Sequence, residues 1–304
     1  MKKTHITVCI CTYKRPHALR RLLESLCAQK TDNKFELSAS IVDNDAALSA
    51  KPIIEEFRSD NRMDIHYAHA TEHNLALLRN ISVDNSKGDY VAFIDDDEYA
   101  VDQWLLLLLN TILEQGVSGA FGPVLPKFEI KPPRWIEKGR FCERARHKTG
   151  FRLKGQHTRT GNALLRRDIL LDPTNRFDPK FRLGAEDDTL FERLIKKGHE
   201  LAWCDEAIVY EEIPAQRLKE RYFIKRARLI GYMSYAYSRD ERPRYKNGLA
   251  LFGSCAKSIF YVVSLPLSLA MGYHQFVRTL TRLSYNSAVI GTALGFLRID
   301  RRDL

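Results

Sequence analysis

The sequence predicts an α/β fold: a mostly parallel, Rossmann-like sheet flanked by helices, followed by a helical C-terminal segment. Short apolar runs of strand length alternate with segments that carry apolar residues at helical spacing. Strands that alternate with helices in this way form parallel sheets with right-handed crossovers. Acidic residues follow one of the strand-like runs, and open α/β sheets bind ligands at the carboxyl ends of their strands.

The first part of the chain predicts four strands and three helices. We expect strands at residues 6–12, 38–42, 63–68 and 90–94. The first helix should begin near Pro16, because proline suits the first helical turn and four leucines follow at i, i+3, i+4 and i+7. These leucines are Leu19, Leu22, Leu23 and Leu26. Further helices are expected around residues 53–57 and at 75–83.

The next part of the chain continues the pattern less regularly. We expect an apolar helix at residues 101–113 and strands at 120–124 and 160–165. Residues 126–157 are basic and aromatic without a clear period, which predicts a mobile loop near the site. A helix should start near Glu186 and end at Gly198, a favoured C-terminal residue.

Three consecutive aspartates, Asp95, Asp96 and Asp97, directly follow the apolar run at 90–94. Adjacent carboxylates raise each other's pKa unless a cation or hydrogen-bond donors offset their charge. Mg²⁺ and Mn²⁺ are usually held by one or two carboxylates together with substrate phosphates. The triplet therefore predicts a divalent metal carrying a diphosphate, and the alternative is a polar turn that caps the next helix.

A second acidic group, Glu186, Asp187 and Asp188, lies at the predicted helix start. A helix N-terminus favours acidic residues by itself, so capping alone would explain this group. Taken with the aspartate triplet, it suggests a site in which one group binds a metal nucleotide and the other supplies a general base.

Composition limits the classes of protein that fit. With 304 residues, 44% of them hydrophobic, the chain can bury one substantial core. The six cysteines show no metal-binding spacing and suggest buried reduced thiols in a cytosolic protein, and the N-terminus does not resemble a signal peptide. Residues 215–304 hold 16 Lys or Arg against 5 Asp or Glu, so the net charge of +10 is concentrated there. This distribution disfavours nucleic-acid binding.

The C-terminal segment predicts contact with a membrane. Residues 217–228 suggest a basic amphipathic helix, and 259–273 and 288–297 are apolar but shorter than the roughly 20 residues that span a bilayer. We expect helices that lie on or dip into the membrane, with nearby arginines at anionic headgroups. These are Arg278, Arg282, Arg298, Arg301 and Arg302. The alternative is a pair of helices packed on the domain.

Several motifs, taken in order, resemble those of family 2 glycosyltransferases. They are Cys11-Thr12-Tyr13-Lys14-Arg15-Pro16, Val42-Asp43-Asn44-Asp45, Arg79-Asn80, Phe93-Ile94-Asp95-Asp96-Asp97-Glu98, Thr160-Gly161-Asn162-Ala163-Leu164-Leu165-Arg166-Arg167 and Glu186-Asp187. The resemblance covers about residues 5–240 and is closest to bacterial exopolysaccharide enzymes of the succinoglycan glucosyltransferase type. The ordered series is more specific than any single motif.

This resemblance implies a GT-A fold, a nucleotide-diphosphosugar donor and an inverting reaction. Its implied nucleotide-sugar-binding residues are Thr12, Tyr13, Arg15, Asp43, Arg79, Asp95 and Asp96. Asp43 would accept from the base edge, Arg79 would contact base or phosphate, and Asp97, with Asp95, would bind Mg²⁺ or Mn²⁺. Asp187 would be the catalytic base, with Glu186 beside it contacting acceptor hydroxyls. Simpler roles remain open: Thr12 and Asp43 as helix caps, Arg79 in a surface ion pair, and Tyr13 in the core.

The chain departs from the family pattern after its last strand. Many relatives have a histidine there that can join the metal, whereas this chain has Val209-Tyr210-Glu211-Glu212-Ile213-Pro214. Either Glu211 replaces that ligand, or the metal rests on Asp97 and the phosphates alone. The glycine often found before the Arg79 helix is also missing.

We therefore expect a catalytic domain at residues 1–240 and a membrane-association region at 241–304. The expected enzyme transfers a hexose, with UDP-glucose the first choice of donor, to a lipid-linked saccharide at the cytoplasmic face of the bacterial inner membrane. One alternative is a sugar nucleotidyltransferase, although residues 12–16 lack the glycine-rich loop it would need. The other is a non-catalytic membrane scaffold with a degenerate transferase domain.

Overall fold

The computed structural model describes residues 3–239 and 243–299 and divides into two compact units. Unit 1 comprises Met1–Lys127 and Arg144–Glu212, and unit 2 comprises Phe128–Glu143 and Ile213–Leu304. The division differs from the expected boundary at residue 240. The reason is that helix α8 (Glu220–Ala236) packs on helix α10 (Tyr273–Ala293), so both belong to unit 2.

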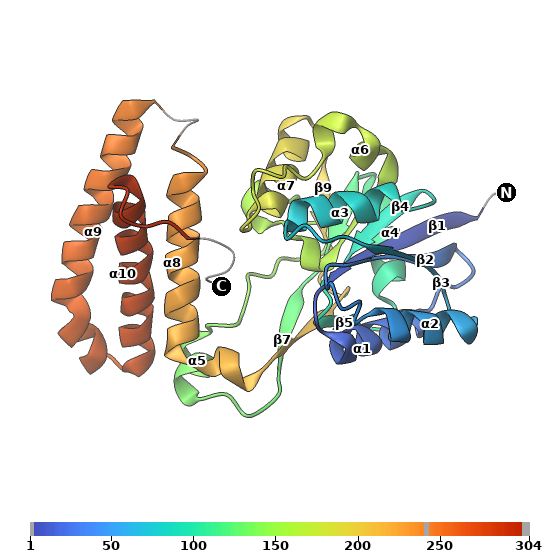
Figure 1. Cartoon of the computed structure of the whole chain (residues 1–304), viewed down its shortest axis with the longest axis horizontal. Helices are drawn as coiled ribbons and strands as arrows, with labels where there is room; N and C mark the ends of the chain where they lie inside the picture. Colours follow the sequence, from blue (N-terminus) through green and yellow to red (C-terminus); the bar gives the residue numbers. More distant parts are fainter. Residues whose placement is uncertain (1–2, 240–242, 300–304) are drawn as a thin grey trace. The chain divides into compact units, whose positions relative to one another are not determined.

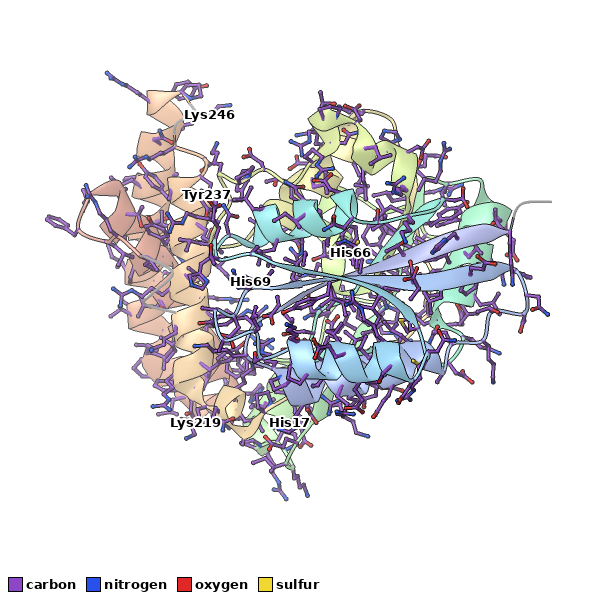
Figure 2. The ribbon with its side chains drawn as sticks, turned by 45° about the vertical axis from the view of Figure 1, so that its right-hand side comes forward. His17, His66, His69, Lys219, Tyr237 and Lys246 are labelled. Carbon is purple, nitrogen blue, oxygen red and sulfur yellow. The ribbon has the colours of Figure 1, made fainter. Side chains whose placement is uncertain are left out.

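Unit 1 is built on a seven-stranded sheet in the order β3-β2-β1-β4-β8-β6-β9. The strands are β1 Thr4–Thr12, β2 Phe35–Asp43, β3 Asp64–His69, β4 Tyr90–Phe93, β6 Gly119–Phe121, β8 Ala163–Arg166 and β9 Leu201–Trp203. Strand β8 runs antiparallel to both neighbours, and the other pairs are parallel. His66 and His69 mark edge strand β3 (Figure 2). The prediction of a mostly parallel sheet is confirmed.

Helices cover both faces of this sheet (Figure 1). One face packs against α1 (Pro16–Cys27), α2 (Lys51–Ser59) and α4 (Trp104–Gln115). The other packs against α3 (Leu75–Asp84), α6 (Arg167–Leu171) and α7 (Glu186–Lys196). All four leucines expected on the buried side of α1 are buried. Helix α7 ends before Gly198, as predicted.

Several local expectations were wrong. The strand expected at 120–124 is broken after β6, and β7 (Val124–Phe128) joins β5 (Glu98–Ala100) and β10 (Val209–Ile213) in a second sheet. The break is at Gly122, where a Cβ atom would lie 2.3 Å from the carbonyl oxygen of Ala207. Residues 126–157 are not a continuous loop, because they contain α5 (Arg134–Gly139) with Ile136 buried. The described residues also include four short 3-10 helices: Gly155–His157, Thr160–Asn162, Pro173–Asn175 and Ala215–Leu218.

The cysteines only partly match the expectation. All six are free, but only Cys9 and Cys204 are buried. Burial raises the pKa of the Cys9 thiol to about 12, which keeps it protonated and unreactive.

Unit 2 consists mainly of three long helices: α8, α9 (Arg244–Ala270) and α10. Helix α10 packs against both α8 and α9, and also against α5. The approach of α8 to α10 is close at Gly231, where a Cβ atom would lie 2.2 Å from the carbonyl oxygen of Tyr285. In Figure 2, Lys219 lies at the start of α8, Tyr237 at its end and Lys246 near the start of α9.

Helix α9 is longer than the apolar segment expected at residues 259–273. It has 27 residues, or about 40 Å at 1.5 Å per residue. It is the one helix in the described part of the chain that is long and apolar enough to cross a membrane, judged by length and composition only. The apolar run begins well before residue 259 in the folded helix, because Leu249, Leu251 and Phe252 extend it towards the N-terminus.

Candidate functional site

The register of the central strands brings the loop after β1 beside the loop after β4. Cys9 pairs with Phe93 in the parallel ladder, so Thr12 and Asp96, each three residues further on, lie at the same level. The Thr12 hydroxyl donates to Asp96 Oδ2 at 2.9 Å, and the Tyr13 N–H donates to the same oxygen at 3.3 Å. The two loops are thus joined through one carboxylate.

Asp96 is nearly inaccessible, with 5% of its surface exposed. Burial raises the pKa of its carboxyl group to about 6, and the neighbouring Asp97 adds to the rise. Arg15 opposes this effect, because it donates to Asp96 Oδ1 at 2.7 Å and lies 3.0 Å from Asp97 Oδ2. Arg15 therefore supplies the positive charge that the aspartate triplet requires.

Arg79 of α3 connects the two acidic groups that the sequence singled out. Its Nη1 donates to Glu186 Oε1 at the start of α7, and its Nη2 donates to Asp95 Oδ1 at 3.3 Å. Both Arg79 and Glu186 are buried, whereas the Asp95 side chain is half exposed. The acidic groups, about ninety positions apart in sequence, therefore meet on one guanidinium.

Electrostatics in this cluster depend on the balance between burial and pairing. Burial lowers the pKa of Arg79, but Glu186, Asp95 and Asp187 outweigh it and raise the pKa. Burial also raises the pKa of Glu186, with Arg79 opposing the change and Asp187 adding to it. Removing the guanidinium would leave Glu186 buried without its compensating charge.

The start of α7 presents its acids in three different environments. Glu186 is buried, Asp187 is half-buried and Asp188 is exposed. Ala185 precedes the helix with a φ of 72°, and the Asp188 N–H donates to Asp187 Oδ1 at 2.8 Å. The free N–H groups of a helix N-terminus favour negative charge, but burial outweighs this effect at Glu186, and burial together with Asp187 raises the pKa of Asp188 to about 6.

Glu98 directly follows the three aspartates and belongs to the same site, although the motifs implied no role for it. It is buried, and its Oε2 accepts the Asp95 N–H at 3.0 Å. Burial, with Asp95 adding to it, raises the pKa of Glu98 well above its usual range. A Cβ atom at Gly161 would lie 2.7 Å from Glu98 Oε1, so the glycine leaves room for this carboxyl group. Two features of the sequence indicate this role for Glu98. It is a fourth acidic residue directly after the triplet, and the Thr160-Gly161-Asn162 motif contains a glycine.

Asp43 is fully buried, and its oxygens are engaged within the protein. Oδ1 accepts the Asp45 N–H at 2.9 Å, while Oδ2 accepts the Ala50 N–H at 3.2 Å and the Tyr67 hydroxyl at 3.0 Å. These bonds order the loop between β2 and α2.

Tyr13 is not a core residue, because 44% of its surface is exposed. Its ring meets the edge of His73 with 5.6 Å between centroids, and His73 Nδ1 lies 2.8 Å from Asn44 Oδ1. Lys14 Nζ lies over the Tyr13 ring, 5.1 Å from its centroid, so a planar ligand would stack on the ring beside this cation or replace it.

The groups that could hold a metal are few. The Asp97 side chain is 17% exposed and lies next to Arg15. Glu211, the expected substitute ligand, pairs with Arg144 Nη2 at 2.7 Å. Across residues 3–239 and 243–299, no set of three His, Cys, Asp or Glu side chains is arranged to hold a metal ion. The oxygen donors fit only a hard cation that obtains most of its ligands from phosphate.

Comparisons with known proteins show the family of this chain. The model of glycosyl transferase family 2 matches residues 7–172. The succinoglycan biosynthesis protein ExoM of Rhizobium meliloti (strain 1021) is 37% identical over 227 residues, which cover 73% of this chain and 71% of ExoM.

Solved structures share the fold at low sequence identity. The mannosyltransferase PcManGT from Pyrobaculum calidifontis, in complex with GDP-Man and Mn²⁺, matches with a TM-score of 0.61 and 14% identity, over 96% of this chain and 88% of its own. S. aureus TarS 1–349, in complex with UDP-GlcNAc, matches with a TM-score of 0.55 and 16% identity, over 97% and 92%.

The sheet topology and the matching solved structures show a GT-A fold, and the family match over residues 7–172 makes the protein a glycosyltransferase. The chain belongs to glycosyl transferase family 2.

Replacing Arg79 with methionine should lower the free energy of unfolding by about 3–5 kcal/mol, because it leaves the buried Glu186 carboxylate unpaired. Chemical denaturation followed by circular dichroism measures the loss. Adding Glu186→Gln should recover part of it, since a neutral amide no longer needs the guanidinium. The control is Arg166→Met, which removes the exposed pair with Asp168 and should cost less than about 1 kcal/mol. Equal losses at the two arginines would contradict the bridging role of Arg79.

Proposed function

We propose that this glycosyltransferase moves a hexose from a nucleotide-diphosphosugar to a hydroxyl of a lipid-linked oligosaccharide, with inversion at the anomeric carbon. The observation that carries the proposal is that Arg79 donates hydrogen bonds to both acidic groups, at the carboxyl edge of the sheet. One group can serve the donor and the other the acceptor, which a single displacement requires.

The donor half of the site would be the edge formed by the loops after β1 and β4. Tyr13 offers an exposed ring for the base, and Arg15 offers a cation beside the aspartates. The PcManGT and TarS complexes hold GDP-Man and UDP-GlcNAc, which supports a nucleotide-sugar donor. UDP-glucose remains the first candidate, on the resemblance to succinoglycan-type glucosyltransferases, and ExoM is named as a succinoglycan biosynthesis protein.

Asp97, with Asp95 beside it, would hold Mg²⁺ or Mn²⁺ together with the donor diphosphate. When bound, such an ion neutralises the charge that develops on the leaving diphosphate. The chain's own contribution is to keep these carboxylates in place: Glu98 accepts the Asp95 N–H, and Arg15 contacts Asp97.

The acceptor half would be the start of α7. Asp187 is half-buried at the helix N-terminus and would take the proton from the attacking hydroxyl as general base. Within the described residues, Glu186 Oε2 is buried without a hydrogen-bond partner, which supports a role in accepting from an acceptor hydroxyl. Arg79 would act by positioning Glu186 and Asp95.

Unit 2 supports a membrane-bound acceptor. Helix α9 exposes large apolar side chains along its length, including Phe252, Phe260 and Val263. Only 6% of its most apolar 18-residue stretch is buried. The surplus of basic residues in the C-terminal segment favours a membrane surface rich in anionic lipid. We place the enzyme at the cytoplasmic face of the bacterial inner membrane, acting in exopolysaccharide or cell-surface glycan synthesis.

Asp187→Asn and Asp97→Asn should each lower kcat by about 100-fold to 10,000-fold, because each removes a group needed in the transition state rather than in ground-state binding. Steady-state kinetics of nucleotide release would show this loss with a smaller change in KM. Asp188→Asn, in the same helical turn, should keep kcat within about threefold, since this exposed side chain has no part in the proposed reaction. Full turnover in the folded Asp187 and Asp97 variants would refute these roles.

A panel of UDP-glucose, UDP-galactose, UDP-GlcNAc and GDP-mannose should identify a donor from which the purified enzyme slowly releases nucleoside diphosphate. Release should require Mn²⁺ or Mg²⁺, because the ion would neutralise the leaving diphosphate. A chelator should stop it, because the described residues offer no set of three metal ligands that would retain the ion. Pyrophosphate release from UTP and a sugar 1-phosphate would instead identify a nucleotidyltransferase. Inactivity of the wild-type protein in both assays would favour the non-catalytic scaffold.

A further inference from the structure

Unit 2 contains a pocket of about 490 Å³ between α8 and the segment that follows α10. This segment folds back on its helix, because the Leu297 N–H donates to the Gly291 carbonyl oxygen at 2.9 Å. The turn uses Gly295, whose φ of 79° is readily adopted by glycine. The fold-back brings residues 297–299 to the pocket wall.

Four cations line this pocket: Lys225, Arg226 and Arg228 from α8, and Arg298 from the fold-back segment. All four are exposed, and within residues 3–239 and 243–299 none of them forms an ion pair. Four cations around one cavity repel one another unless an anion is bound among them. Guanidinium groups favour phosphate, which they bind through two parallel hydrogen bonds.

The rest of the pocket lining consists of Tyr222 and three aliphatic residues. Leu229 lies one residue beyond Arg228 on α8, and Leu297 and Ile299 flank Arg298. A small inorganic anion would leave these side chains uncovered, whereas an amphiphile would place its charge on the arginines and its chain against the leucines. The pocket therefore fits a phosphate group attached to a hydrocarbon chain.

The same unit contains the exposed apolar helix α9, which favours a bilayer as the source of this ligand. We propose that the pocket binds the head group of one anionic membrane phospholipid, with its phosphate among the four cations. The proposal adds a specific lipid-binding site to the membrane association proposed above, and it rests on that association alone. It involves no residue assigned to sugar transfer.

The test uses the full-length enzyme in a neutral detergent, titrated with short-chain phosphatidylglycerol by isothermal titration calorimetry. Wild type should bind one equivalent saturably and should bind phosphatidylcholine at least about tenfold more weakly, since zwitterionic lipid lacks the net charge. The pair Arg226→Gln and Arg298→Gln should weaken binding about tenfold or more, and so should Lys225→Gln with Arg228→Gln. The control pair, Arg221→Gln and Lys246→Gln, removes the same charge outside the pocket and should change affinity less than about twofold.

Three results would overturn the proposal. Equal losses in the pocket and control pairs would mean diffuse attraction to the basic surface. Equal affinity for inorganic phosphate would mean a simple anion site. A preference of more than tenfold for polyprenyl phosphate would mean that the occupant is an isoprenoid lipid. Asp187→Asn protein should bind phosphatidylglycerol like wild type, so the lipid site and the transfer reaction can fail independently.

Discussion

The buried guanidinium of Arg79 is the interaction on which the site depends. Asp95 and Glu186 come from distant parts of the chain, and both carry charge that would otherwise repel. A buried ion pair contributes little net stability compared with apolar packing, but loss of one partner is costly. We therefore infer that Arg79 contributes less to net stability than to positioning. It fixes where the acidic start of α7 lies relative to the end of β4.

The three adjacent aspartates have different surroundings despite their common sequence context. Asp95 faces Arg79, Asp96 is buried under the loop after β1, and Asp97 lies beside Arg15. All three follow the end of β4, and Asp96 and Asp97 lie in the turn that leads into β5. The proposal therefore uses Asp97 and the half-exposed Asp95 for the donor, while Asp96 supports the loop that would receive it.

The sequence predicted the mostly parallel sheet and the order of its strands and helices along the chain, because apolar runs and helical spacing are local signals. It also predicted that the acidic residues lie at the carboxyl ends of the strands. It did not predict the break at Gly122, strand β5 or the second sheet, because these depend on close contacts between distant segments. The two acidic groups were found, but their link was not. Arg79 was expected at the nucleotide, and only the packing of α3 against the sheet shows that it faces the carboxylates.

A crystal structure of the full-length enzyme with UDP and Mn²⁺ tests this account most directly. We predict that the diphosphate lies beside Asp97, while Arg79 still bridges Asp95 and Glu186 and Asp187 faces the space beyond the β-phosphate. A structure in which Arg79 leaves the carboxylates to bind the diphosphate, or in which the nucleotide lies away from the aspartates, would contradict it.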